Sequence, residues 1–175
     1  MGVEDWIPAR FYFGFRWTDS LQLFSKTPKH SIDRNDAYFD LISVTTLTAI
    51  YLTKLANNLS CRDDIDMDLA KEIHSCLKLA GSMFLYVKNH MVSELDQSVC
   101  LVKKSWSDLD PRILETYSLQ CQAELLEVTI ARAIKLNHSA HLIASLSQDC
   151  QKLFKSALER LDSTEDDDEK MVEKW

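Results

Sequence analysis

Glycine and proline are scarce in this chain of 175 residues, which contains three of each. A β-sandwich or β-barrel needs a turn roughly every 8–12 residues, and such turns usually contain glycine, proline or asparagine. The long stretches without either residue argue strongly against an all-β fold. The same scarcity leaves no glycine-rich loop that could hold a phosphate group, so we expect no nucleotide cofactor.

An excess of basic residues is also missing. The net charge is −7, and the five carboxylates of residues 165–169 account for most of it. Because a nucleic-acid-binding module carries a basic excess, we expect no nucleic-acid partner. Uninterrupted apolar runs stay shorter than the roughly 20 residues of a membrane span. The sequence shows no signal-peptide or lipidation pattern, so we expect neither a membrane span nor a lipid anchor.

Motifs for metal binding or catalysis are absent as well. The five cysteines are an odd number, which favours free thiols in a reducing compartment and predicts a cytoplasmic chain. Neither a Cys-x-x-Cys nor a His-Glu-x-x-His pattern occurs, so we expect no metal site. Nothing marks one cysteine as a nucleophile. We therefore identify no catalytic residue and expect no enzyme.

Hydrophobic periodicity predicts one strand followed by four long helices. Aromatic residues alternate over residues 11–17, which is the period of a strand. Helical spacing then predicts helices over about 36–59, 66–90, 110–136 and 139–161. We expect an all-α fold of stacked long antiparallel helices, tetratricopeptide-like, with one short N-terminal strand. The domain is expected to span residues 1–164, followed by a solvated acidic tail over 165–175.

The apolar stripes on these helices predict how they pack. The helix at 66–90 is apolar on one side only, so Lys71 and Lys78 should face solvent. The helix at 110–136 carries two apolar stripes and should lie between two neighbours. Leu142 lies beside the core stripe of the last helix. The expected core stripes of the first and last helices are Leu41, Thr45, Thr48, Leu52, Leu55 and Leu59, and Ile143, Leu146, Cys150, Phe154, Ala157 and Leu161.

Three segments resemble a known family, the BRO domain. The segments EIHSCLKLAGSMF at 72–84 and DLDPRILETYSLQCQAELLEVTIARAIKLNHSAHLIASLS at 108–147 resemble the middle of that domain. The segment FRWTDSL at 15–21 resembles the end of the family's small β-sheet. The resemblance extends over about residues 13–175. Since a complete BRO domain is much longer, it implies that the chain corresponds to the central part of the domain.

The resemblance also implies a partner and a site. BRO domains bind the C-terminal amphipathic helix of an ESCRT-III subunit, of the charged multivesicular body protein 4 type, in endosomal sorting and membrane remodelling. The two aliphatic positions of the family's apolar trio fall on Leu142 and Leu146, and its aromatic position falls on Thr129. Lys71 matches a family lysine, and Lys78 lies one turn beyond a second lysine position.

Two interpretations remain open once the resemblance is taken into account. In the first, the chain is an interaction module that partners recruit to endosomal or nuclear membranes. In the second, it is a truncated helical scaffold that lacks a competent binding groove. Ordinary core packing is the alternative role for Leu142 and Leu146, and simple solvent exposure is the alternative for Lys71 and Lys78.

Overall fold

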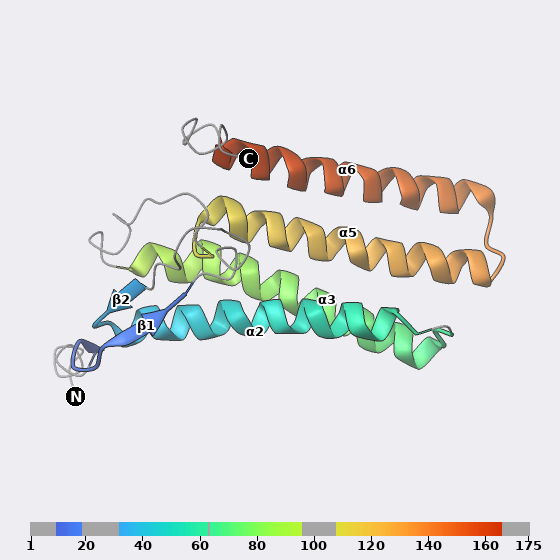
Figure 1. The fold of residues 1–175 in the computed structure, drawn as a ribbon. Coiled ribbons are helices and arrows are strands. Elements are labelled where there is room, and N and C mark those ends of the chain that lie inside the picture. The colour runs from blue at the N-terminus through green and yellow to red at the C-terminus, as the bar shows by residue number, and fades with distance from the viewer. Residues whose placement is uncertain (1–9, 19–31, 63, 96–107, 166–175) are drawn as a thin grey trace, which may run out of the picture.

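Four long helices follow one another in a stack. The computed structural model describes residues 10–18, 32–62, 64–95 and 108–165 of the chain. Within these residues each long helix packs against the next, and Figure 1 shows α2 and α6 at the two outer edges. The prediction of an all-α stack with a short N-terminal strand is confirmed. The helices are α2 (Ala37–Ser60), α3 (Met67–Tyr86), α5 (Pro111–Lys135) and α6 (Ala140–Glu165).

Aspartate caps fix where three of these helices begin. Asp36, Asp66 and Asp110 each accept a hydrogen bond from a main-chain N–H of the first turn, which satisfies a donor that has no partner within the helix. Pro111 follows Asp110 in the first helical position, where its missing N–H costs nothing. Between α5 and α6 the chain turns at Asn137, whose φ of 54° lies in the left-handed region that asparagine tolerates.

The N-terminal strand has a partner that the sequence did not reveal. β1 (Phe15–Trp17) pairs antiparallel with β2 (Ile32–Arg34). Arg16 lies opposite Asp33, and its guanidinium donates two hydrogen bonds of 2.6 and 3.0 Å to that carboxylate. The predicted strand over 11–17 is too long, since residues 11–14 precede β1. A three-residue strand such as β2 is too short to produce a recognisable alternation.

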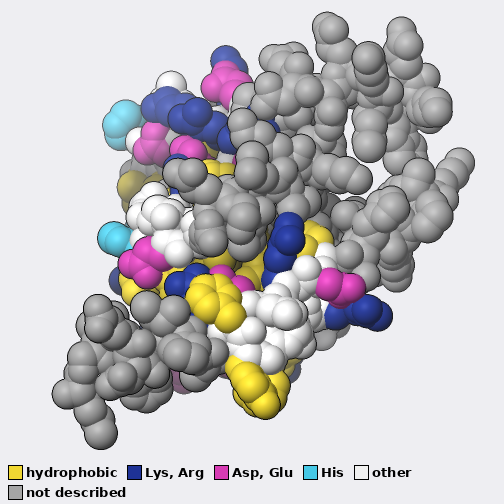
Figure 2. All heavy atoms as spheres, turned by 90° about the vertical axis from the view of Figure 1, so that its left-hand side faces the viewer, with side chains coloured by type: hydrophobic (Ala, Val, Ile, Leu, Met, Phe, Trp, Pro, Cys, Tyr) yellow, Lys and Arg dark blue, Asp and Glu magenta, His cyan; other side chains and the backbone are white. Residues whose placement is uncertain are grey.

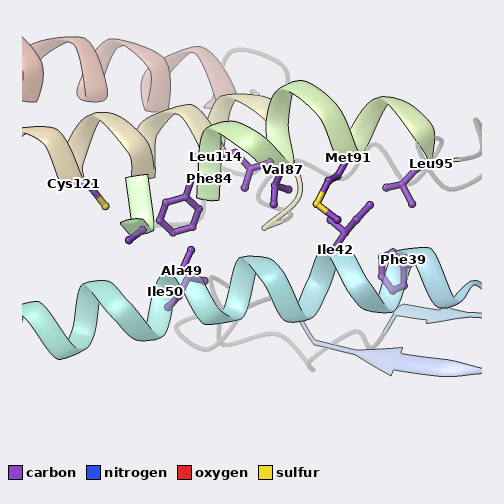
Figure 3. Close-up of a cluster of buried hydrophobic side chains, with 11 residues drawn as sticks. Phe39, Ile42, Ala49, Ile50, Phe84, Val87, Met91, Leu95, Leu114 and Cys121 are labelled. Atoms are coloured by element: carbon purple, nitrogen blue, oxygen red, sulfur yellow. The ribbon is translucent and has the colours of Figure 1, made fainter. Parts of the chain in front are cut away.

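The main core lies where α2, α3 and α5 meet. Figure 3 shows Ile50 of α2 opposite Phe84 of α3. Further along the same cluster, Ile42 lies opposite Met91, and Phe39 lies near Leu95. Leu114 of α5 completes this cluster and is fully buried. A second, smaller cluster closes the other end of the α2–α3 pair; its buried members are Ala56, Leu59, Ile73 and Leu77.

The face of α2 that packs on α3 differs from the predicted one. The predicted stripe began with Leu41 and included Thr48, but both side chains are exposed. Phe39, Ile42 and Ala49 are buried instead. Because every residue from 41 to 53 is uncharged, the sequence offers no polar face by which to orient this helix. Hydrophobic spacing alone therefore selected the wrong side for the first half of the helix, whereas in the second half Leu59 is buried and Leu52 and Leu55 pack against the core as predicted.

The other helices pack largely as their stripes predict. The stripe of α5 that contains Cys121 faces α3, and the stripe that contains Ala123 faces α6. On α6, Cys150 and Ala157 are buried, but Phe154 is 38% exposed and does not belong to the core. Phe154 lies at the edge of the α5–α6 contact, because among the described helices α6 packs mainly against α5.

The chain remains helical beyond the end of α3. After Tyr86 the chain continues as a π-helix, η3 (Val87–Met91), and a 3-10 turn, η4 (Val92–Glu94), where a loop was expected from about residue 90. With 24 residues, α2 is long and apolar enough to cross a membrane, although no membrane span was expected from the sequence. The core helix of a domain can be equally long and apolar. Cys100 and the acidic tail after 165 lie outside the described residues.

Candidate partner-binding surface

Leu142 and Leu146 lie one turn apart near the beginning of α6. Leu142 is 42% exposed, and its main-chain N–H donates a hydrogen bond of 3.3 Å to Ser139 Oγ. Leu146 is half-buried against α5. Leu142 is thus an exposed leucine at the edge of a helix contact.

Thr129 on α5 is half-buried, and its hydroxyl already has a partner. Its Oγ1 donates a 2.9 Å hydrogen bond to the carbonyl of Leu125, one turn earlier. This bond satisfies the polar atom, so the Thr129 methyl group is available for apolar contact.

The contacts between helices show which of these residues lie at the same level of the stack. Cys150 of α6 donates from its Sγ to the carbonyl of Ala123 on α5 at 3.5 Å. Counting six residues along each antiparallel helix from this pair brings Thr129 level with residue 144, midway between Leu142 and Leu146. The three apolar candidates therefore lie at one level of the α5–α6 pair.

A similar count connects α5 to α3. Ser118 on α5 donates a 3.1 Å hydrogen bond to the carbonyl of Gly81 on α3. Eleven residues further along α5, and eleven back along α3, Thr129 comes level with residue 70, beside Lys71. Lys78 lies two turns closer to the Ser118–Gly81 contact. The stack thus brings Lys71, Thr129 and the two leucines to one level, with Lys78 at one end.

The two lysines differ in what they contact. Lys71 forms an ion pair of 3.1 Å with Asp68, and both side chains are largely exposed. Such a surface pair contributes little to stability, so the Lys71 ammonium can exchange partners easily. Lys78 is exposed and has no ion-pair partner among the described residues. Both lysines therefore present a charge to solvent.

Comparison with known proteins identifies the family. The model of the BRO1-like domain family matches residues 5–175. The BRO1 domain-containing protein BROX of Homo sapiens is 39% identical over 156 residues, and that of Danio rerio is 37% identical over 148 residues. The chain belongs to the BRO1-like domain family. These alignments cover 89% and 85% of this chain but only 36% and 34% of the relatives, so the chain spans about a third of their length.

A more distant relative gives the same picture. The BRO1 domain-containing protein BROX homolog of Caenorhabditis elegans is 33% identical over 153 residues, which are 87% of this chain and 34% of that protein. The resemblance to a BRO domain expected from the sequence is thereby confirmed.

An ion-pair network that the sequence did not predict joins three elements of this BRO1-like domain. The carboxylate of Glu115 on α5 contacts Lys88 Nζ of η3 at 2.6 Å and Arg160 Nε of α6 at 3.3 Å. The hydrogen bond from Lys88 is the main reason that the pKa of Glu115 is lowered. Since the three residues are far apart in sequence, no local spacing announces the network.

Helical geometry relates this network to the candidate residues. Leu142 and Arg160 are eighteen residues apart, about five complete turns, so they lie on the same side of α6. Thr129 is fourteen residues from Glu115, which places the two within about 40° of one another around α5. Because Arg160 contacts Glu115, Leu142 and Thr129 lie on the same side of the α5–α6 pair.

The described residues line two hollows. One, of about 430 Å³, lies between the α2–α3 connection and α5. Its basic residues already hold the connection, since Arg132 donates to the carbonyl of Ile65 at 3.2 Å and Lys135 contacts Asp64. The second, of about 150 Å³, lies beside α2 and is lined by residues such as Trp17, Phe39 and Leu109. The described part of the first hollow is thus of mixed charge.

The described side chains show little preparation for catalysis or metal binding. Burial raises the pKa of the Cys121 thiol to about 12, and burial also raises the pKa of Cys150 and Cys76. A nucleophilic cysteine has a lowered pKa instead. No group of three or more histidines, cysteines and carboxylates that could hold a metal occurs within the described ranges. On the face in Figure 2, basic and acidic side chains are intermixed.

Proposed function

We propose that this BRO1-like chain is a non-catalytic interaction module that binds the C-terminal amphipathic helix of an ESCRT-III subunit, of the charged multivesicular body protein 4 type. The observation that carries the proposal is the exposed Leu142, which lies level with Thr129 on the same side of the α5–α6 pair. Leu146 extends this apolar strip by one turn. Lys71 and Lys78 supply positive charge near the strip.

An amphipathic helix suits this arrangement for two reasons. Its apolar residues recur every three or four positions, so two of them can contact Leu142 and Leu146, which have the same spacing. Acidic residues beside those anchors can pair with Lys71 or Lys78. An extended peptide would need an open sheet edge, and the described sheet has only two strands of three residues.

The affinity expected from these contacts is low. Two or three apolar anchors are worth about 1.5–3 kcal/mol each when fully buried. Association and ordering of the peptide cost at least about 4 kcal/mol. The remainder corresponds to dissociation constants in the micromolar range or weaker. Such affinity fits an adaptor that partners recruit from the cytoplasm to endosomal or nuclear membranes.

A direct binding measurement tests the proposal. A fluorescent peptide with the amphipathic helix is titrated with the chain, and its polarisation is followed, with a peptide of the same composition but scrambled order as the control. Saturable binding of the helix alone supports the proposal. Equal or absent binding of both peptides, by a chain whose circular dichroism shows native helicity, supports a scaffold without a competent groove.

A further inference from the structure

The outer face of α2 is apolar, and no helix of the described part of the chain packs on it. The side chains on this face are large and hydrophobic, and Tyr51 is 62% exposed and Leu41 52% exposed. Val44 and Leu47 lie between them and are exposed to a similar degree. Figure 1 shows α2 at the edge of the stack, with α3 packed on its other side. Among the described residues, α3 packs on one side of α2 and Trp17 of β1 contacts its N-terminal end at Asp40, while the face from Leu41 to Tyr51 is left exposed.

The sequence of α2 sharpens this contrast. Every residue from 41 to 53 is uncharged, although much of this segment faces solvent. A helix that is apolar around its circumference is normally buried on all sides. A contiguous exposed apolar surface of this kind usually marks an interaction site. The face therefore fits a partner that is itself apolar over about the same length.

The charges at the two ends of the segment indicate which partner. Asp40 precedes it, Lys54 follows it, and Leu47 lies midway between them. We propose that α2 pairs with α2 of a second copy of this chain, antiparallel and with the two-fold axis near Leu47. In that arrangement Asp40 of each copy lies beside Lys54 of the other. A parallel pair would instead bring like charges together at both ends.

Asp40, Leu47 and Lys54 lie on the same side of α2, so all three can contact one partner helix. Asp40, Leu47 and Lys54 are seven residues apart, so each lies within about 20° of the next. Val44 and Tyr51 fall between them at the spacing of a helix–helix seam. One carboxylate oxygen of Asp40 accepts a 2.9 Å hydrogen bond from Trp17 Nε1. The same carboxylate has a second oxygen that is able to receive an ammonium group.

This pairing is separate from the proposed peptide site. α2 lies at one edge of the stack, whereas Leu142 lies on α6 at the other edge. A dimer through α2 would leave two peptide sites exposed. Substitutions on α2 should therefore change the assembly of the chain without changing its affinity for the peptide.

Cysteine cross-linking and sedimentation test the proposal together. In a background with Cys61→Ser and Cys100→Ser, either Leu47→Cys or Asn58→Cys is introduced and oxidised. The antiparallel pair brings the two copies of position 47 together but keeps the copies of position 58 about 33 Å apart. We expect a disulfide-linked dimer for Leu47→Cys and at least tenfold less for Asn58→Cys. Equal cross-linking at both positions would contradict the antiparallel arrangement.

Sedimentation of the unmodified chain provides the second readout. We expect a concentration-dependent dimer, and at least tenfold weaker association for Leu47→Glu, with unchanged helicity and unchanged peptide binding. A monomer at every concentration tested would overturn the proposal, and binding of that monomer to phosphatidylcholine vesicles would assign the face to a lipid surface. A Leu47→Glu chain that still dimerises would overturn it equally.

Discussion

Ser118 on α5 donates a hydrogen bond of 3.1 Å to the main-chain carbonyl of Gly81 on α3. The same glycine allows the two helices to approach closely, since a Cβ added to Gly81 would lie 3.3 Å from the Cβ of Cys121. This contact sets the register of α3 against α5. It is therefore also what brings Lys71 level with Thr129.

Enlarging residue 81 should destabilise the stack. Gly81→Leu would force α3 and α5 apart, and overpacking of this kind costs about 1–3 kcal/mol. Gly81→Ala is the matched control, because the gain in helix propensity, up to about 1 kcal/mol, offsets the tight contact. Urea unfolding followed by circular dichroism measures both. A Gly81→Leu chain as stable as the alanine variant would show that the helices do not need this approach.

The stability of the domain should fall in acid partly through Glu115. Contacts with Lys88 and Arg160 lower the pKa of Glu115 below its usual 4.5, so its contribution is fully present above about pH 4.5. It is lost as the pH falls through the lowered pKa. Glu115→Gln should cost about 1–2 kcal/mol near neutral pH and nothing in stronger acid. A cost independent of pH in unfolding experiments would contradict this role.

The cysteines should differ in reactivity. Because burial raises the pKa of the Cys121 thiol to about 12, very little of it is present as the reactive thiolate at pH 8. Cys61 is exposed. Mass spectrometry after brief alkylation should find Cys61 modified in the native chain and Cys121 modified only after unfolding. Rapid labelling of Cys121 in the native chain would show that α5 is accessible.

Charge near the peptide site should affect binding modestly. Lys71→Ala should weaken peptide binding about two- to threefold and reduce its dependence on salt, as expected for a charge at the rim. Lys155→Ala is the control, since Lys155 is an exposed lysine of α6 that contacts Glu159 at 3.9 Å. Polarisation titrations at two salt concentrations make the comparison. The assignment of Lys71 fails if both variants respond alike.

The sequence predicted the helices well because their signals are local. Asp66 and the pair Asp110–Pro111 are typical helix starts, and α3 and α5 carry clear apolar stripes. The orientation of α2 could not be predicted, because residues 41–53 are uncharged on every side. Phe154 was assigned to the core although it is exposed, since periodicity does not reveal that, within the described ranges, α6 packs mainly against α5.

The candidate site was predictable only in part. The spacing of Leu142 and Leu146, together with the resemblance to BRO domains, is enough to single out these two residues. The position of the two leucines along the helix stack, relative to Thr129 and Lys71, depends on contacts between helices. An example is the Ser118–Gly81 hydrogen bond, which joins residues far apart in the chain. β2 and the Glu115 network depend on such long-range contacts too.

The most direct test of the account replaces one leucine on each side of α6. Leu142 and Leu158 are both exposed but lie about 160° apart around the helix. Leu142→Asp would set a carboxylate against the apolar anchors of the peptide. We predict that this variant loses detectable binding of the amphipathic peptide in polarisation titrations, while Leu158→Asp binds like the wild type and both retain native helicity. Wild-type affinity in the Leu142→Asp variant would contradict the proposed site.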